Sequence, residues 1–143
     1  MGHILVIDDD RVVLSLVSGI LEAHGHSVTT AQDGRAGMEV FGRRHVDLVV
    51  TDIVMPGQEG MATISAIRRR SPKVPILAMS GSNTQGRYGS YLDAATLLGA
   101  NATLLKPITV PGLMGAVDRL LAPKGSEKAE ASERDIRSRL TSS

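Results

Sequence analysis

The chain of 143 residues has no cysteine and no tryptophan, and aromatic residues make up only 2% of it. Without cysteine there is no disulfide framework, thiol nucleophile or zinc–thiolate site. So few aromatic rings argue against a base-stacking surface for nucleic acids. The net charge of +1 gives no sign of a nucleic-acid partner either. We therefore expect no nucleic-acid partner.

Long apolar runs are also missing. No stretch approaches the roughly 20 apolar residues needed to span a bilayer. The N-terminus lacks the basic segment, apolar stretch and cleavage site of a secretory signal. The absence of cysteine fits a reducing compartment. We expect a cytoplasmic protein that does not insert into membranes.

Short apolar runs alternate five times with helix-like stretches. The runs predict strands at His3–Asp8, Ser27–Ala31, Val46–Asp52, Val74–Ser80 and Asn101–Leu105. The intervening patterns predict helices at Arg11–His24, Gly34–Arg44, Glu59–Arg70, around Tyr88–Ala95 and around Leu113–Leu121. This alternation predicts an α/β fold with parallel strands and helices on both faces. The consecutive apolar residues 48–50 are typical of a strand that is covered on both sides.

This pattern ends near residue 122, so we expect one domain over residues 1–122. Residues 123–143 alternate in charge sign and contain only two large apolar residues, Ile136 and Leu140. Such a segment has little apolar surface to bury, so we expect a charged and mobile tail.

Polar residues follow four of the predicted strands. Asp8 and Asp9 follow the first, Asp52 the third, Ser80 the fourth and Lys106 the fifth. In an open parallel sheet, ligands bind beyond the carboxyl ends of the strands, so these residues should meet at one edge. Carboxylates that lie so close together repel each other, and a divalent cation relieves this repulsion. The cluster therefore predicts Mg²⁺, which binds carboxylates, waters and phosphate oxygens.

The same residues suit phosphoryl transfer. A carboxylate can act as a nucleophile and accept a phosphoryl group. Lys106 supplies a compact positive charge for a phosphoryl oxygen, and the Ser80 hydroxyl can donate a hydrogen bond to it. Each residue also has an ordinary structural interpretation: Asp9 or Asp10 as a helix N-cap, Asp52 and Ser80 in turns, Lys106 as a solvated charge. Their coincidence at four strand ends favours a site.

These motifs resemble the receiver domain of bacterial two-component response regulators, the CheY-like family. The resemblance covers residues 3–122 and depends on four segments in family order, which are residues 4–10, residues 52–60, Ser80-Gly81 and Lys106-Pro107. It implies a doubly wound, flavodoxin-like sheet with the strand order 2-1-3-4-5.

By this resemblance, Asp52 is the phosphorylation site, and a histidine kinase or histidine phosphotransfer protein is the donor. Asp8, Asp9, Asp52 and the Val54 backbone carbonyl would hold Mg²⁺. Ser80, Gly81 and Lys106 would surround the phosphoryl group, and Pro107 would follow a cis peptide bond. The chain would be a signalling phosphoacceptor rather than an enzyme, acting on a protein target that the sequence does not identify.

The sequence departs from the family at two places. The position of the family's switch aromatic is occupied by Thr103, and we expect residues 82–87 to form an additional loop at the edge of the site. The sequence also shows no DNA-binding or enzymatic output segment, so we expect output through protein binding. A phosphorylation-dependent dimer remains compatible with the sequence.

Three alternatives stay open. Asp8-Asp9-Asp10 also fits the motif of haloacid-dehalogenase-like phosphatases, with Asp8 as nucleophile and Asp10 as general acid, but this leaves Asp52 without a role. A flavodoxin-like flavin or nucleotide binder would need aromatic residues and a phosphate-binding glycine loop that the chain lacks. The third is a receiver-like interaction module that is never phosphorylated.

Overall fold

The protein is built around a single parallel β-sheet. The computed structural model describes residues 2–53, 59–81, 95–96 and 98–122. The sheet has five strands in the order β2-β1-β3-β4-β5, and all its neighbours are parallel. The strands are β1 (His3–Ile7), β2 (Ser27–Ala31), β3 (Leu48–Asp52), β4 (Ile76–Ser80) and β5 (Ala102–Leu105). The expected strand order is confirmed.

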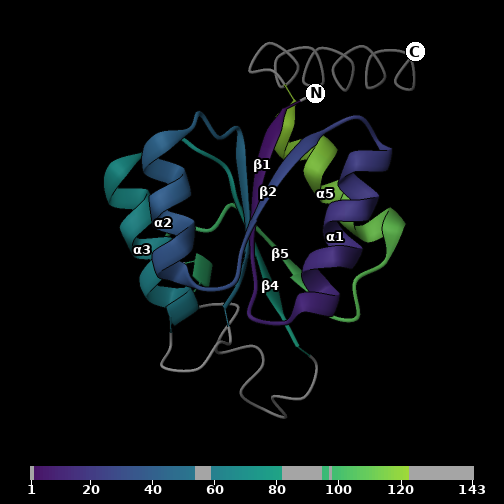
Figure 1. Cartoon of the computed structure of the whole chain (residues 1–143), viewed down its shortest axis with the longest axis horizontal. Helices are drawn as coiled ribbons and strands as arrows, with labels where there is room; N and C mark the ends of the chain where they lie inside the picture. The colour runs from purple at the N-terminus through teal and green to yellow at the C-terminus, as the bar shows by residue number, and fades with distance from the viewer. Residues whose placement is uncertain (1, 54–58, 82–94, 97, 123–143) are drawn as a thin grey trace, which may run out of the picture.

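Helices cover both faces of this sheet. They are α1 (Arg11–Ala23), α2 (Gly34–Arg43), α3 (Glu59–Arg70) and α5 (Val110–Leu121). Figure 1 shows α2 and α3 together on one face and α1 and α5 on the other, so the predicted arrangement in layers is confirmed. No helix in the described part of the chain is both long and apolar enough to cross a bilayer.

Alternate residues of the strands pack into two separate cores. In β1, Leu5 and Ile7 belong to the core under α2 and α3, whereas Ile4 and Val6 belong to the core under α1 and α5. Successive side chains of a strand point to opposite faces, which explains this division. Every residue of β3 is buried, as expected for a central strand that is covered on both sides.

Side-chain caps fix the start of three helices. Asp10 caps α1, Asp33 caps α2 and Thr109 caps α5, each accepting a hydrogen bond from a backbone N–H of the first turn. Each side-chain oxygen satisfies a donor that has no partner within the helix. These caps place the helix starts close to the carboxyl ends of the preceding strands.

Three strands begin later than the sequence pattern predicts, and β5 does so by one residue, at Ala102 rather than Asn101. β3 begins at Leu48 rather than Val46, and β4 begins at Ile76 rather than Val74. Proline has no N–H to donate to a sheet ladder, so Pro75 delays the start of β4. Most of the helix expected around Tyr88–Ala95 lies outside the described residues, although Ala95 is helical and fully buried. The expected loop at 82–87 and tail at 123–143 also lie outside them.

Candidate functional site

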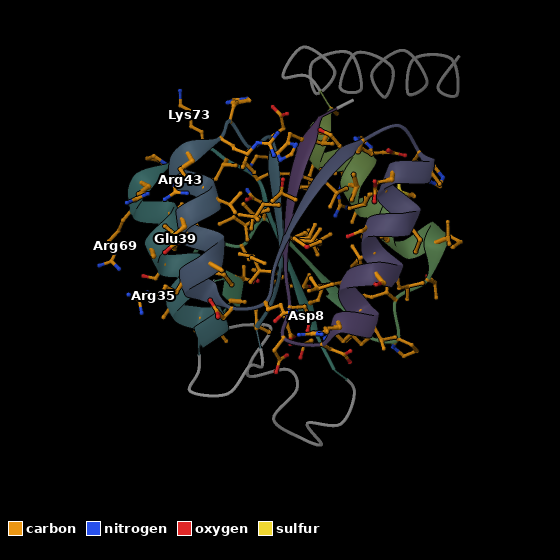
Figure 2. All side chains as sticks on the ribbon, viewed as in Figure 1. Asp8, Arg35, Glu39, Arg43, Arg69 and Lys73 are labelled. Atoms are coloured by element: carbon orange, nitrogen blue, oxygen red, sulfur yellow. The ribbon has the colours of Figure 1, made fainter. Side chains whose placement is uncertain are left out.

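The polar residues singled out in the sequence gather at the carboxyl edge of the sheet. Asp8 directly follows β1, Asp52 ends β3, Ser80 ends β4 and Lys106 directly follows β5. Figure 2 places Asp8 at this edge, where β1 turns into α1. The parallel strand order brings these four positions to one end of the fold, as the sequence predicts.

Lys106 connects two of the aspartates. Its Nζ atom donates a hydrogen bond to Asp8 Oδ2 at 2.8 Å and lies 3.4 Å from Asp52 Oδ2. Asp8 is fully buried and Asp52 nearly so. Buried carboxylates need a compensating charge or hydrogen bonds. The Lys106 ammonium supplies that compensation to both aspartates.

The backbone also contributes to this site. Asp8 Oδ1 accepts a hydrogen bond from the Asp10 N–H at 2.9 Å, and Asp10 Oδ1 in turn accepts one from the Val12 N–H at 2.9 Å. Of the three consecutive aspartates, Asp10 is therefore the helix cap. The hydrogen bond from the Asp10 N–H holds the Asp8 carboxylate in the site. The side chain of Asp10 is the N-cap of α1, as the structural interpretation of this residue predicts.

Burial and neighbouring charges shift the pKa values of both Asp8 and Lys106. Burial raises the pKa of Asp8 above its usual value, although hydrogen bonds from Lys106 and the Asp10 backbone partly oppose this effect. For Lys106, burial alone would lower the pKa. The hydrogen bond to Asp8 and the charge of Asp52 outweigh burial, so the pKa of Lys106 is raised. The site therefore favours a bound positive charge.

Three carboxylates are close enough to share a cation. Oxygen atoms of Asp8, Asp9 and Asp52 all lie within 4.8 Å of one another. Asp9 is exposed, whereas the other two are buried, so the cluster opens to solvent on one side. Carboxylate oxygens with room for water are the donor set that Mg²⁺ prefers. The described residues thus fit Mg²⁺; Val54, whose carbonyl was expected to complete the set, lies outside them.

The hydroxyl group of Ser80 is buried at the end of β4. Among the described residues, no hydrogen-bond partner is found for its Oγ atom. A buried hydroxyl without a partner costs free energy, which a ligand oxygen at this position would recover. The Ser80 carbonyl accepts a hydrogen bond from the Lys106 N–H at 2.8 Å, which aligns the ends of β4 and β5.

The remaining predicted positions lie in β5 or directly after β4 and β5. Among the described residues, a Cβ atom added to Gly81 would meet no atom within 4 Å. The Lys106–Pro107 peptide bond is cis. Thr103 is half-buried in β5 and pairs with Ala78 of β4.

Gly60, the last residue of the 52–60 segment, lies beside the end of β3. A Cβ atom at Gly60 would collide with the backbone carbonyl oxygen of Asp52 and with Ile53. Only glycine lets the first turn of α3 lie this close to the end of β3. The sequence signal was a glycine in the first turn of a helix, where propensity alone disfavours it.

Known proteins share both the sequence pattern and the fold. The response regulator receiver domain family matches residues 4–118. The transcriptional regulatory protein GlrR of Escherichia coli is 34% identical over 132 residues, which are 89% of this chain but 28% of that protein. The response regulator MprA of Mycolicibacterium vanbaalenii is 33% identical, with 83% of this chain and 50% of that protein covered. The chain thus spans about a quarter to a half of the length of these relatives.

Solved structures of about the same length as this chain have the same fold. The receiver domain of NtrX from Brucella abortus is 31% identical with a TM-score of 0.76, and the match covers 82% of this chain and 97% of that domain. The chemotaxis protein CheY4 of Vibrio cholerae is 28% identical with a TM-score of 0.75, over 85% of this chain and 99% of that one. With its sheet order and the family match over residues 4–118, the chain belongs to the response regulator receiver domain family.

Proposed function

We propose that this protein is the phosphoacceptor of a two-component phosphorelay in the cytoplasm, and that Asp52 accepts the phosphoryl group. The observation that carries the proposal is the position of Lys106 Nζ, 2.8 Å from Asp8 Oδ2 and 3.4 Å from Asp52 Oδ2. A positive charge between two buried carboxylates suits a reaction that adds negative charge at this point. We assign residues 1–122 to the receiver domain and residues 123–143 to a charged tail.

The chemistry is a transfer between two side chains. A carboxylate oxygen of Asp52 attacks the phosphorus of a phosphohistidine on a histidine kinase or phosphotransfer protein. The bond between the histidine nitrogen and phosphorus breaks, and an acyl phosphate forms on Asp52. Lys106 neutralises the charge on the phosphoryl oxygens, and the Ser80 hydroxyl donates a hydrogen bond to one of them.

Mg²⁺, held by Asp8, Asp9 and Asp52, would neutralise phosphoryl charge and help to position the group. The carboxylate set of the described residues supports this assignment. The Val54 carbonyl is proposed as a further ligand on the resemblance alone.

Phosphorylation would act by changing a protein-binding surface. In the proposed switch, Ser80 is drawn toward the phosphoryl group and β4 and β5 shift with it, which is a local charge change that biases a two-state element. Thr103 has no aromatic ring that could rotate, so the response at β5 would differ from that of receivers with an aromatic residue there. We propose that the changed surface binds a downstream target protein, and that it also allows a dimer to form upon phosphorylation.

The first prediction tests Asp52 directly. The wild-type protein, treated with Mg²⁺ and acetyl phosphate, should gain one phosphoryl group, and site mapping should place it on Asp52. Asp52→Asn should gain none, because an amide oxygen is a much weaker nucleophile than a carboxylate, and its circular dichroism spectrum should be unchanged. Intact-mass spectrometry is the measurement.

The control is Asp118→Asn, which removes an exposed carboxylate from α5 and should leave labelling unchanged. Label on Asp8 would support the phosphatase-like alternative and overturn the proposal. Absence of label from wild-type protein, with either acetyl phosphate or a phosphorylated histidine donor, would indicate an interaction module that is not phosphorylated.

A further inference from the structure

The outer side of the α2–α3 layer is strongly basic. Five exposed cationic residues lie on it, in α2, at the end of α3 and in the turn that follows: Arg35, Arg43, Arg69, Arg70 and Lys73. Figure 2 shows that the labelled members of this set all lie along the α2–α3 side of the molecule. We call these five residues the basic face. It is a local excess of charge, because the whole chain has a net charge of only +1.

No carboxylate in the described part of the chain forms an ion pair with this positive charge. Among the residues that the structure describes, none of the five forms an ion pair. Glu39 lies in α2 four residues from both Arg35 and Arg43, a spacing at which helical residues can pair. It pairs with neither of them. The basic face therefore projects a field that attracts an anionic partner.

A groove runs through this face between the two helices. Its first part, with a volume of about 230 Å³, is lined mainly by small and apolar residues: Gly34, Arg35, Met38, Ala62, Thr63 and Ala66. Its second part, of about 560 Å³, is lined by three arginines and one glutamate, Arg35, Arg43, Arg70 and Glu39, together with Met38 and Gly42. The two parts share Arg35 and Met38, so they are continuous along α2.

Gly42 keeps the second part of the groove open to Arg70. A Cβ atom at Gly42 would lie 2.7 Å from Arg70 Nη1, so the missing side chain lets that guanidinium extend from α3 across to α2. The groove consequently has a partly apolar floor and cations along its length. The ten residues of α2 give it a length of about 15 Å, which corresponds to roughly three turns of a bound helix.

We propose that the groove between α2 and α3 binds an acidic amphipathic segment of another protein. The apolar side chains of the segment would enter the groove beside Met38 and Ala66, and its carboxylates would pair with the basic face. An arginine guanidinium binds a carboxylate with two parallel hydrogen bonds, which suits this contact. An amphipathic helix laid in a groove is a common mode of peptide recognition.

Other anionic partners fit the face less well. A nucleic-acid backbone would use the cations but leave the apolar floor unfilled. A membrane surface would favour large apolar side chains beside the cations. The exposed large apolar residues of the described chain lie elsewhere: Val12, Leu16, Leu98, Leu105 and Val110. The groove also contains none of the residues proposed for phosphoryl transfer, so its test does not depend on that function.

The test uses a designed peptide of about 14 residues, with leucines on one helical face and glutamates on the other. Fluorescence anisotropy would measure its binding to the full chain. We expect saturable binding that weakens with salt. The double variant Arg35→Glu/Arg43→Glu should weaken binding at least about tenfold, since it removes two ion pairs with the peptide and adds repulsion between like charges. Ala62→Tyr, at an exposed groove position, should also weaken it by filling the space.

The matched control is Arg119→Glu, which reverses an exposed charge on α5 and should change affinity less than about twofold. A second peptide has the same composition with its leucines scrambled, and it should bind at least about tenfold more weakly. Equal binding of the two peptides would overturn the proposal that the apolar face of the segment enters the groove. Insensitivity to the double variant, or tighter binding to duplex DNA or to anionic phosphatidylserine vesicles, would overturn the proposed partner.

Discussion

At the scale of single residues, the site holds charged side chains in a buried environment, which disfavours their ionised form. Asp8 is fully buried, and its pKa is raised mainly by that burial despite the hydrogen bond from Lys106. An acid with a raised pKa in the folded state reduces stability when ionised, because the unfolded chain loses its proton more easily. Without a bound cation, Asp8 therefore destabilises the fold at neutral pH.

Replacing Asp8 by a neutral residue should stabilise the fold and weaken Mg²⁺ binding. Asp8→Asn should increase the free energy of unfolding at pH 7 in EDTA, because the neutral amide keeps the shape but not the charge. It should also weaken Mg²⁺ binding at least about tenfold, at the lower end of the loss expected when groups that support a metal site are removed. Urea unfolding and Mg²⁺ titration measure the two effects.

The sign of the pH dependence is fixed by the direction of the pKa shift. The difference in stability between Asp8→Asn and wild type should be largest at neutral pH. It should narrow as the pH falls through the raised pKa of Asp8 toward the ordinary value of 3.8, where wild type also becomes neutral at this position. A difference that widens on acidification would contradict the assignment. Asp118→Asn, at an exposed position, is the control.

At the scale of elements, the contact between α3 and β3 depends on one glycine. Gly60→Ala would push a methyl group against the Asp52 carbonyl and Ile53, both of which are backbone contacts that cannot give way cheaply. We expect a loss of about 1–3 kcal/mol in unfolding free energy, as for other overpacked sites, and slower phosphorylation of Asp52. Chemical denaturation and the mass assay measure these effects.

The control for Gly60 is another helical glycine. A Cβ atom at Gly115 of α5 would meet no atom within 4 Å. Gly115→Ala should therefore be stabilising by about 0.5–1 kcal/mol through helix propensity alone. If Gly60→Ala behaved like Gly115→Ala, the close approach of α3 to β3 would not be real.

A second contact between elements is made by Arg68 at the end of α3. Its guanidinium donates hydrogen bonds to the Ser71 and Val74 carbonyls before β4, and to the Gly99 carbonyl and Asn101 Oδ1 before β5. Asn101 Oδ1 also accepts the Ile76 N–H of β4 at 2.9 Å. The planar guanidinium thus ties one helix to the entrances of two strands.

Lysine cannot replace this contact, because a single ammonium group does not reach four acceptors in one plane. Arg68→Lys should lower the free energy of unfolding by about 1–3 kcal/mol through the lost charge-assisted hydrogen bonds. Arg69→Lys, at the exposed neighbouring position, should change it by less than about 0.5 kcal/mol. Equal effects of the two substitutions in urea unfolding would argue against the contact.

At the scale of the whole molecule, the two cores share the central strands of one sheet. We therefore expect the domain to unfold as one unit. Ile67→Ala empties a fully buried position in the α2–α3 core and should cost about 2–5 kcal/mol. Methyl NMR signals of Val117, in the opposite core, should disappear at the same lowered Tm as the circular dichroism signal. A Val117 transition that stayed at the wild-type Tm would show that the cores are independent.

The sequence by itself determined most of the local structure. Apolar runs located the strands to within two residues at each end, and helical periodicity located four helices. Polar residues after Ile7, at Asp52, at Ser80 and after Leu105 indicated the edge that forms the site. These features could be predicted because each depends on neighbours in the chain, through strand alternation, helix periodicity and capping.

Only the tertiary structure decided which groups meet. The 2.8 Å contact between Lys106 and Asp8 joins residues that are 98 positions apart, and it assigns Asp8 to the site while Asp10 caps α1. The sequence placed Asp8 in the carboxylate cluster but left the cap open between Asp9 and Asp10. The contacts of Arg68 and the groove between α2 and α3 likewise had no sequence signal of their own, and the approach of Gly60 to β3 was signalled only by a glycine in the first turn of a helix. They depend on the order of the strands and on how close the helices pack, which no local pattern encodes.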